Sequence, residues 1–239
     1  RERARQIGFS FAEISGEPYW DETAAWEFTA DEVDTLEATT NELERLCRAA
    51  VAHAIQNKLN DVLGIPDAVW PLVPASWHRH EASLYGRMDL HWNGQGPPLF
   101  EAAVVQWEWL TCAQPGADQF NAIHEALIAA WPRLGVAQHV HFTCQRDTDE
   151  DRGTVDYLRD TALQSGASAT FLYIDEIGWN GASFVDLTNR PIEAIFKLYP
   201  WEWILRDEFG NHIARAPTRW IEPAWRLALS SKGILALLW

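Results

Sequence analysis

The sequence predicts an α/β protein with a mostly parallel sheet flanked by helices. Short apolar stretches with strand-like alternation are separated by longer stretches with helical periodicity, and that succession is typical of parallel sheets. The chain has 239 residues, of which 47% are hydrophobic and 22% are charged. This is enough to bury the core of one large domain or of two small ones.

The N-terminal quarter is predicted to contain one long helix. Thr29 and Glu32 have the spacing of a capping box, which marks a helix start. Apolar side chains recur at helical spacing as far as Ile55, and Leu63–Gly64 ends the region. The proline-rich stretch 64–75 is predicted to be a loop. It is the best candidate for a boundary between an N-terminal segment, 1–64, and an α/β region, 65–239, unless the two form one domain.

The later elements follow from the change between the two periodicities. The predicted strands cover 84–91, 138–144, 169–173, 183–187 and 195–198. The predicted helices cover 100–110, 118–131 and 154–163. The acidic stretch 147–151 is interpreted as a solvated loop.

Charge and cysteine content narrow the class of protein. A net charge of −15 argues against a nucleic-acid partner and favours a cationic substrate such as a polyamine. The simpler alternative is an acidic surface that serves solubility alone. No run of 18 apolar residues is present, so no membrane partner is expected. Cys47, Cys112 and Cys144 are odd in number and widely spaced. They are interpreted as thiols in a reducing compartment, which predicts a cytoplasmic protein.

The first candidate for chemistry is the predicted strand that contains Arg87 and Asp89. Residues two apart in a strand face the same way, so both side chains would point into one cleft. A guanidinium suits phosphate oxygens, and a carboxylate suits Mg²⁺. The simpler alternative is a surface ion pair on one face of a strand.

Lys232 is the second candidate, because it follows Ser231 at the start of an apolar run. A lysine there is costly to bury unless it has a partner. The alternative is a lysine whose stem covers apolar surface while its ammonium group stays in water. Glu202 and Glu222 lie beside Trp and Pro residues and are interpreted as hydrogen-bonded structural carboxylates.

Three segments carry a family resemblance: 85–89, 196–203 and the Trp-rich stretch 219–239. Together they resemble the glutathionylspermidine synthase-like family of ATP-grasp ligases, in particular its small stand-alone members. The resemblance implies a preATP-grasp-type sheet that leads into an ATP-grasp region, incomplete in this chain. The sequence stops inside an apolar run, so we expect the protein to continue beyond Trp239.

The family implies an ADP-forming acid–amine ligase, which makes an amide through an acyl phosphate. At the matching positions, the resemblance assigns Arg87 to the reacting phosphate, Asp89 to Mg²⁺ and Lys232 to the phosphates of ATP. ATP and Mg²⁺ are therefore the expected cofactors. The expected substrates are a small-molecule or peptide carboxylate and an amine. The oligomeric state is left open.

The chain also departs from the family. The family strand that supplies a Glu and an Asn to the metal is absent between Pro98 and Leu99. Either that strand is lost, which would make the protein a non-catalytic binding protein, or its residues are missing from the printed sequence, which we favour. Leu198 and Trp203 replace two threonines of the substrate site, which suggests a peptide in place of glutathione. Asp151 matches one member of an acidic pair associated with substrate binding.

Overall fold

The computed structural model describes residues 13–14, 17–18, 27–86, 88, 90, 123–136, 138–147 and 149–238. The chain divides into two units, residues 1–44 with 86–125, and residues 45–85 with 126–239. The domain boundary predicted between residues 64 and 65 stays a prediction.

The first unit contains strands β1 (Glu13–Ile14) and β2 (Glu17–Pro18), which pair antiparallel, and the start of helix α2 (Ala30–Asn57). The predicted capping box is confirmed. The N–H of Glu32 donates to Thr29 Oγ1 at 3.3 Å, and the N–H of Thr29 donates to the Glu32 carboxylate at 2.8 Å. The helix ends at Asn57, before the predicted end at 63–64, because Lys58 takes a left-handed conformation with φ of 52°.

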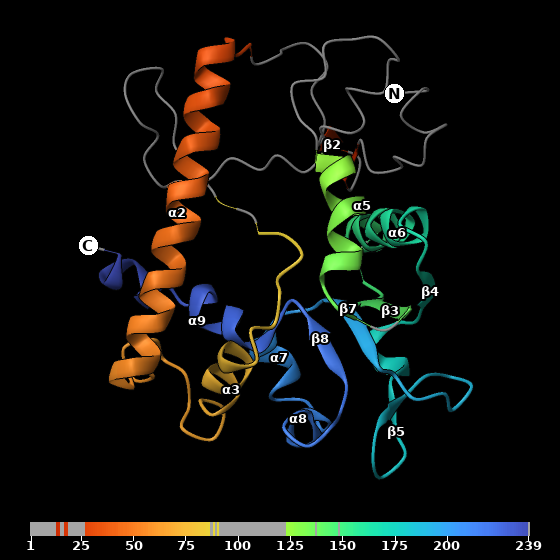
Figure 1. The fold of residues 1–239 in the computed structure, drawn as a ribbon. Helices are drawn as coiled ribbons and strands as arrows, with labels where there is room; N and C mark the ends of the chain where they lie inside the picture. The colour runs from red at the N-terminus through yellow and green to blue at the C-terminus, as the bar shows by residue number, and fades with distance from the viewer. Residues whose placement is uncertain are drawn as a thin grey trace. The chain divides into compact units, whose positions relative to one another are not determined.

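The second unit is built on a four-stranded parallel sheet, which confirms the predicted fold class. Its order is β4 (Ser168–Phe171), β3 (His139–Cys144), β7 (Ala194–Leu198) and β8 (Arg219–Ile221). Helix α6 (Asp149–Gln164) connects β3 to β4, and the two strands pair with His139 opposite Ser168. Figure 1 shows these strands next to one another, with β7 and β8 in blue.

Each face of this sheet is covered by helices. On one face, Phe142 and Phe196 pack with Leu127 and Trp131 of α5 (Ile123–Arg133) and with Val155 of α6. The Trp131 indole N–H donates to Thr161 Oγ1 at 2.9 Å, which ties α5 to α6. Figure 1 shows α5 and α6 together on this side of the sheet.

The opposite face carries a second hydrophobic core. Ile195 and Trp220 project from β7 and β8 into it. They meet Val51 of α2, Val73 of α3 (Leu72–His78) and Ile204 of α7 (Trp201–Ile204). Because both faces are covered, the central strand β7 is buried along almost its whole length.

Short elements complete the unit. They are η1 (Ile174–Glu176), the antiparallel pair β5 (Gly178–Trp179) and β6 (Phe184–Val185), α8 (Gly210–Ile213), η2 (Ala224–Arg226), α9 (Leu227–Ser230) and η3 (Lys232–Leu237). Across the described ranges, no helix is both long and apolar enough to cross a membrane. Cys47 and Cys144 are buried free thiols, while Cys112 lies outside the described residues.

Several predicted elements were confirmed and others were wrong. The strands at 138–144, 169–173 and 195–198 match β3, β4 and β7, and the helix at 154–163 lies within α6. The predicted acidic loop was wrong, because residues 149–151 form the first turn of α6, where carboxylates are favoured by the helix dipole. The predicted proline loop contains α3, since Pro74 falls in the first helical turn and needs no N–H donor there.

The strand predicted over 84–91 is not observed in its described part, residues 84–86, 88 and 90, which have no regular secondary structure. The other residues of that strand, and the helix predicted over 100–110, lie outside the described residues. Strand β8 was not predicted.

Truncation of the sheet core should destabilise the second unit strongly. Phe142 is fully buried between Trp131 and Phe196. Phe142→Ala should lower the free energy of unfolding by about 3–5 kcal/mol, measured by urea denaturation with tryptophan fluorescence. Leu187→Ala is the control, since Leu187 is 72% exposed and should change stability by less than about 0.5 kcal/mol. Equal effects of the two variants would contradict the assigned core.

Candidate functional site

The strand order of the parallel sheet indicates where a ligand would bind. The chain passes from β3 to β4 on one side and later to β7 on the other, so the order reverses between β3 and β7. In open α/β sheets, ligands bind outside the carboxyl ends of the strands at such a point. Here those ends are Cys144 of β3 and Leu198 of β7, which pair in register.

The weakly predicted substrate residues lie around these strand ends. Leu198 is the last residue of β7. Asp151 is in the first turn of α6, close to β3: burial and next the charge of Asp151 raise the pKa of the Cys144 thiol to about 11. Trp203 of α7 is 47% exposed, and its ring packs edge-on against Tyr199 with centroids 5.6 Å apart. The three residues therefore lie at the carboxyl edge of the sheet.

Arg87 and Asp89, the predicted catalytic and metal residues, lie outside the described residues. The segment that leads to them is described as far as Gly86. It is held at the end of β8 by Glu222, whose carboxylate accepts hydrogen bonds from the N–H of Leu84 at 3.0 Å and the N–H of Tyr85 at 3.2 Å. The hydroxyl of Ser83 donates to the same carboxylate.

Glu222 and Glu202 were interpreted as hydrogen-bonded structural carboxylates, and the hydrogen bonds that both accept confirm this interpretation. Burial raises the pKa of Glu222, while its bonds from Ser83, Tyr85 and Leu84 and the nearby Arg226 act in the opposite direction. Glu202 accepts a hydrogen bond from the hydroxyl of Ser230.

Lys197 is the residue that the sequence interpretation missed. Its side chain is only 7% exposed, its ammonium group donates to the carbonyl of Tyr199 at 2.8 Å, and it lies 4.3 Å from the ring centre of Trp201. Burial lowers the pKa of Lys197 to about 7, against the opposing charges of Glu222 and Glu202. The available signal was a lysine inside the apolar run of a central strand.

Lys232, the predicted ATP contact, is the first residue of η3 and is exposed. It does not need the partner that a buried lysine would require. Ser231 caps the segment by accepting a hydrogen bond from the N–H of Gly233 at 3.2 Å. Two residues before Lys232, Ser230 bonds Glu202, so the chain ahead of Lys232 is tied to α7 next to Trp203.

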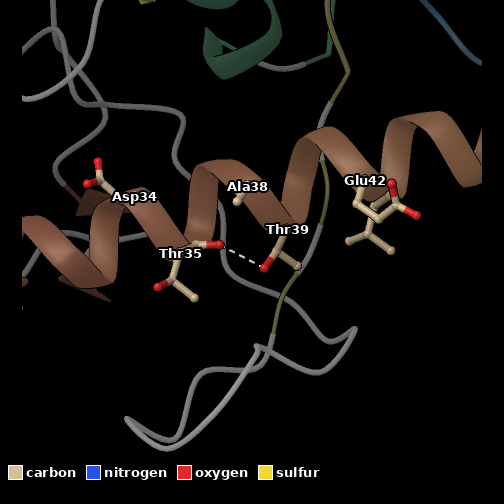
Figure 2. A pocket seen from close by; sticks show the side chains of 6 residues that line it. Asp34, Thr35, Ala38, Thr39 and Glu42 are labelled. Atoms are coloured by element: carbon tan, nitrogen blue, oxygen red, sulfur yellow. Dashed lines mark hydrogen bonds between the residues drawn. The ribbon is translucent and has the colours of Figure 1, made fainter.

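A separate surface hollow is less informative. Figure 2 shows it along α2, lined by Asp34, Thr35, Ala38, Thr39, Glu42 and Leu43. The hydroxyl of Thr39 is directed back to its own helix, donating to the carbonyl of Thr35 at 2.7 Å. Because one helix supplies every lining residue, polar groups do not converge here as they do in a ligand site.

Metal binding was assessed from the side chains that could coordinate an ion. Among the residues that the structure describes, no group of three or more His, Cys, Asp or Glu side chains could hold a metal. The predicted ligand Asp89 is outside this set. The described residues therefore do not by themselves provide a magnesium site.

The second unit is an α/β structure whose parallel sheet reverses its strand order, as ligand-binding sheets of this type do. The buried Lys197 and the apolar residues Leu198 and Trp203 lie at or near the carboxyl edge of this sheet. Comparison with known proteins identifies the family. The family model for the glutathionylspermidine synthase preATP-grasp domain matches residues 1–239. The chain belongs to this family.

Two curated relatives agree with that assignment. A protein named putative acid–amine ligase from Haemophilus influenzae is 39% identical over 255 residues, covering 98% of this chain and 65% of the relative. Trypanothione synthetase from Crithidia fasciculata is 23% identical over 221 residues, covering 74% of this chain and 33% of the relative. The chain therefore spans about two thirds and one third of the lengths of these relatives.

Burial of Lys197 should make stability depend on pH. Folding lowers its pKa from 10.5 to about 7, so between these values the unfolded chain binds more protons than the folded one. The free energy of unfolding should therefore rise with pH across this window. Lys197→Met should flatten the rise, measured by urea denaturation from pH 7 to 10. Lys232→Met, at an exposed site, should retain the wild-type slope, and a wild-type slope in Lys197→Met would contradict the account.

Proposed function

We propose that the protein is an ATP-dependent acid–amine ligase of the glutathionylspermidine synthase kind. The observation that carries the proposal is the match of the whole chain to the preATP-grasp family, together with 39% identity to a protein named as an acid–amine ligase. The parallel sheet with its switch point between β3 and β7 supports a ligand site of the required type.

The proposed reaction has two steps. A carboxylate oxygen of the acid attacks the γ-phosphorus of ATP, and the bond to the β-phosphate oxygen breaks to release ADP. The amine nitrogen then attacks the acyl carbon of the resulting acyl phosphate, the C–O bond to phosphate breaks, and the amine loses a proton. The products are an amide, ADP and inorganic phosphate.

In this proposal, Arg87 neutralises charge on the transferring phosphoryl group and Lys232 contacts the phosphates of ATP. Such reactions depend on positioning and charge more than on covalent work by side chains. The exposure of Lys232 supports its role, because its ammonium group is available to a ligand. For Arg87 the support is its sequence position, two residues after the Tyr85 amide that Glu222 holds.

Asp89 is the proposed ligand of Mg²⁺, which would neutralise phosphate charge when bound. The described residues offer no further group of ligands. No step of the mechanism is therefore assigned to the ion here.

The substrate classes are an acid and an amine. The net charge of −15 would favour the approach of a cationic amine such as a polyamine. Leu198 and the half-exposed Trp203 give the carboxyl edge of the sheet apolar surface. That surface favours a peptide carboxylate as the acid over glutathione. Asp151, at the same edge, is a candidate contact for the amine.

A non-catalytic binding protein is the alternative. It is favoured by the absence of the Glu- and Asn-bearing strand between Pro98 and Leu99. The alignment with the H. influenzae relative extends over more positions than this chain has residues, so the relative carries residues without a counterpart here. Sequencing the gene across this junction would decide between a lost strand and an incomplete printed sequence. A cytoplasmic location is part of the proposal.

Removal of Arg87 or Asp89 should abolish turnover without unfolding the protein. In the full-length protein, Arg87→Ala and Asp89→Ala should each lower ADP release by about 100-fold or more, because charge stabilisation of phosphoryl transfer is lost. Arg215→Ala, at an exposed arginine of the second unit, is the control and should keep wild-type turnover. Unchanged ADP release in either active-site variant would rule out its assigned role.

A further inference from the structure

The segment 81–85 is fastened to the end of β8 by an unusually complete set of hydrogen bonds. Both carboxylate oxygens of Glu222 are used: Oε1 accepts from the N–H of Leu84 and of Tyr85, and Oε2 accepts from the N–H of Leu84 and the hydroxyl of Ser83. Two consecutive backbone amides and one side chain thus converge on one carboxylate, although Glu222 lies 138 residues away from Leu84 in the sequence.

Neighbouring groups hold the same segment in place. The guanidinium of Arg226 donates to Ser83 Oγ at 3.0 Å, and the indole N–H of Trp225 donates to the carbonyl of Glu81 at 2.9 Å. Leu84 is buried in the core that contains Phe196, and the ring of Tyr85 stacks on Phe196 with centroids 6.4 Å apart. The backbone from Glu81 to Tyr85 is therefore fixed from both sides.

The electrostatic cost of this arrangement indicates that it has a purpose beyond packing. Glu222 directly follows Ile221, the last residue of β8, and its charge interacts with that of Lys197 in β7. The charge of Arg226 also acts on the Glu222 carboxylate, and the charge of Glu202 in α7 acts on Lys197. A buried charge persists only when it is paired and hydrogen-bonded. The Glu222 carboxylate meets both conditions, and the hydrogen bonds that it accepts all come from one short loop segment, residues 83–85.

The position of that segment in the sequence gives the purpose. Arg87 and Asp89 follow Tyr85 by two and four residues, and consecutive Cα atoms are only about 3.8 Å apart. Because the backbone of Leu84 and Tyr85 is held in place, the positions that Arg87 can reach are limited. Displacement of a catalytic group by about 1 Å can cost about 100-fold in rate.

We propose that Glu222 is a positioning residue for catalysis, which holds the backbone of Leu84 and Tyr85 and thereby sets the place of Arg87. The inference rests on the proposed function, because it takes Arg87 as the catalytic arginine. It assigns to the carboxylate a role distinct from contact with substrate, ATP or metal.

Asp186 provides a matched control. Its carboxylate also uses both oxygens: Oδ1 accepts from the N–H of Thr188 at 2.9 Å, from the Thr188 hydroxyl and from the N–H of Arg190 at 3.0 Å, and Oδ2 lies 3.3 Å from Nε2 of His141. Although burial alone would raise it, these bonds hold the pKa of Asp186 at about 2. Asp186→Asn therefore makes the matching change, one accepting oxygen in place of two, in a segment that does not lead to Arg87.

The test compares Glu222→Gln with Asp186→Asn in the full-length protein. Glutamine has one accepting oxygen in place of two, so hydrogen exchange at Leu84 and Tyr85 should become at least about tenfold faster. The increase should extend across the peptide that covers residues 84–90. The kcat for ADP release should fall about 10- to 100-fold, with a smaller change in the KM for ATP. Ser83→Ala, which removes one of the bonds, should give a smaller change in the same direction and serves if Glu222→Gln does not fold.

Asp186→Asn should leave exchange at 84–90 and the kcat unchanged. Equal losses of kcat in the Glu222 and Asp186 variants, or unchanged exchange at 84–90 in Glu222→Gln, would overturn the proposal. Absence of ADP release from the wild type would instead overturn the proposed function. In that case the role of Glu222 in catalysis would be overturned as well. Faster exchange at residues 84–90 in Glu222→Gln would then show only that Glu222 holds this segment in place.

Discussion

The largely buried carboxylate of Glu222, just past the end of β8, needs hydrogen-bond donors, and this requirement constrains the segments packed around it. The donors to the carboxylate come from residues 83–85. The backbone carbonyl of Glu222 accepts a separate hydrogen bond from the indole N–H of Trp201 at 3.2 Å. The same stretch places Trp225 in the core, where its N–H bonds Ser76 of α3. The carboxylate thus ties the loop 83–85 to the end of β8, and its loss would leave the donors of that loop unsatisfied. The backbone carbonyl of Glu222 and the amide of Trp225 add the links to α7 and α3.

Charge at this edge also connects the fold with the proposed chemistry. Lys197 is buried in β7, where its charge interacts with that of Glu222, and two nearby residues, the half-buried Leu198 and the exposed Trp203, are apolar. Buried charges at the edge of a sheet cost stability. Proteins commonly keep them at functional sites, where charged groups must be held in place. The chain belongs to the glutathionylspermidine synthase preATP-grasp family, and the phosphoryl transfer proposed above would depend on positioned groups of this kind.

Local signals in the sequence predicted the elements that local interactions determine. The capping box at Thr29 and Glu32 and the alternation in β3 were read correctly, since both depend on neighbours a few residues away. Strand β8 was missed, because three residues have no clear periodicity and their pairing with β7 is set by a distant segment. The burial of Lys197 and the partners of Glu222 were missed for the same reason. The roles of Arg87, Asp89 and Lys232 came from the family resemblance and stay predictions.

The most direct test of the proposed ligase follows one oxygen atom. The full-length protein would be given Mg·ATP, a polyamine, and glutathione or short peptides with ¹⁸O in the carboxylate, and the released phosphate would be analysed by mass spectrometry. An acyl-phosphate route predicts one ¹⁸O transferred from acid to phosphate for each amide formed. Release of ADP with unlabelled phosphate, or no release with any acid and amine, would contradict the account.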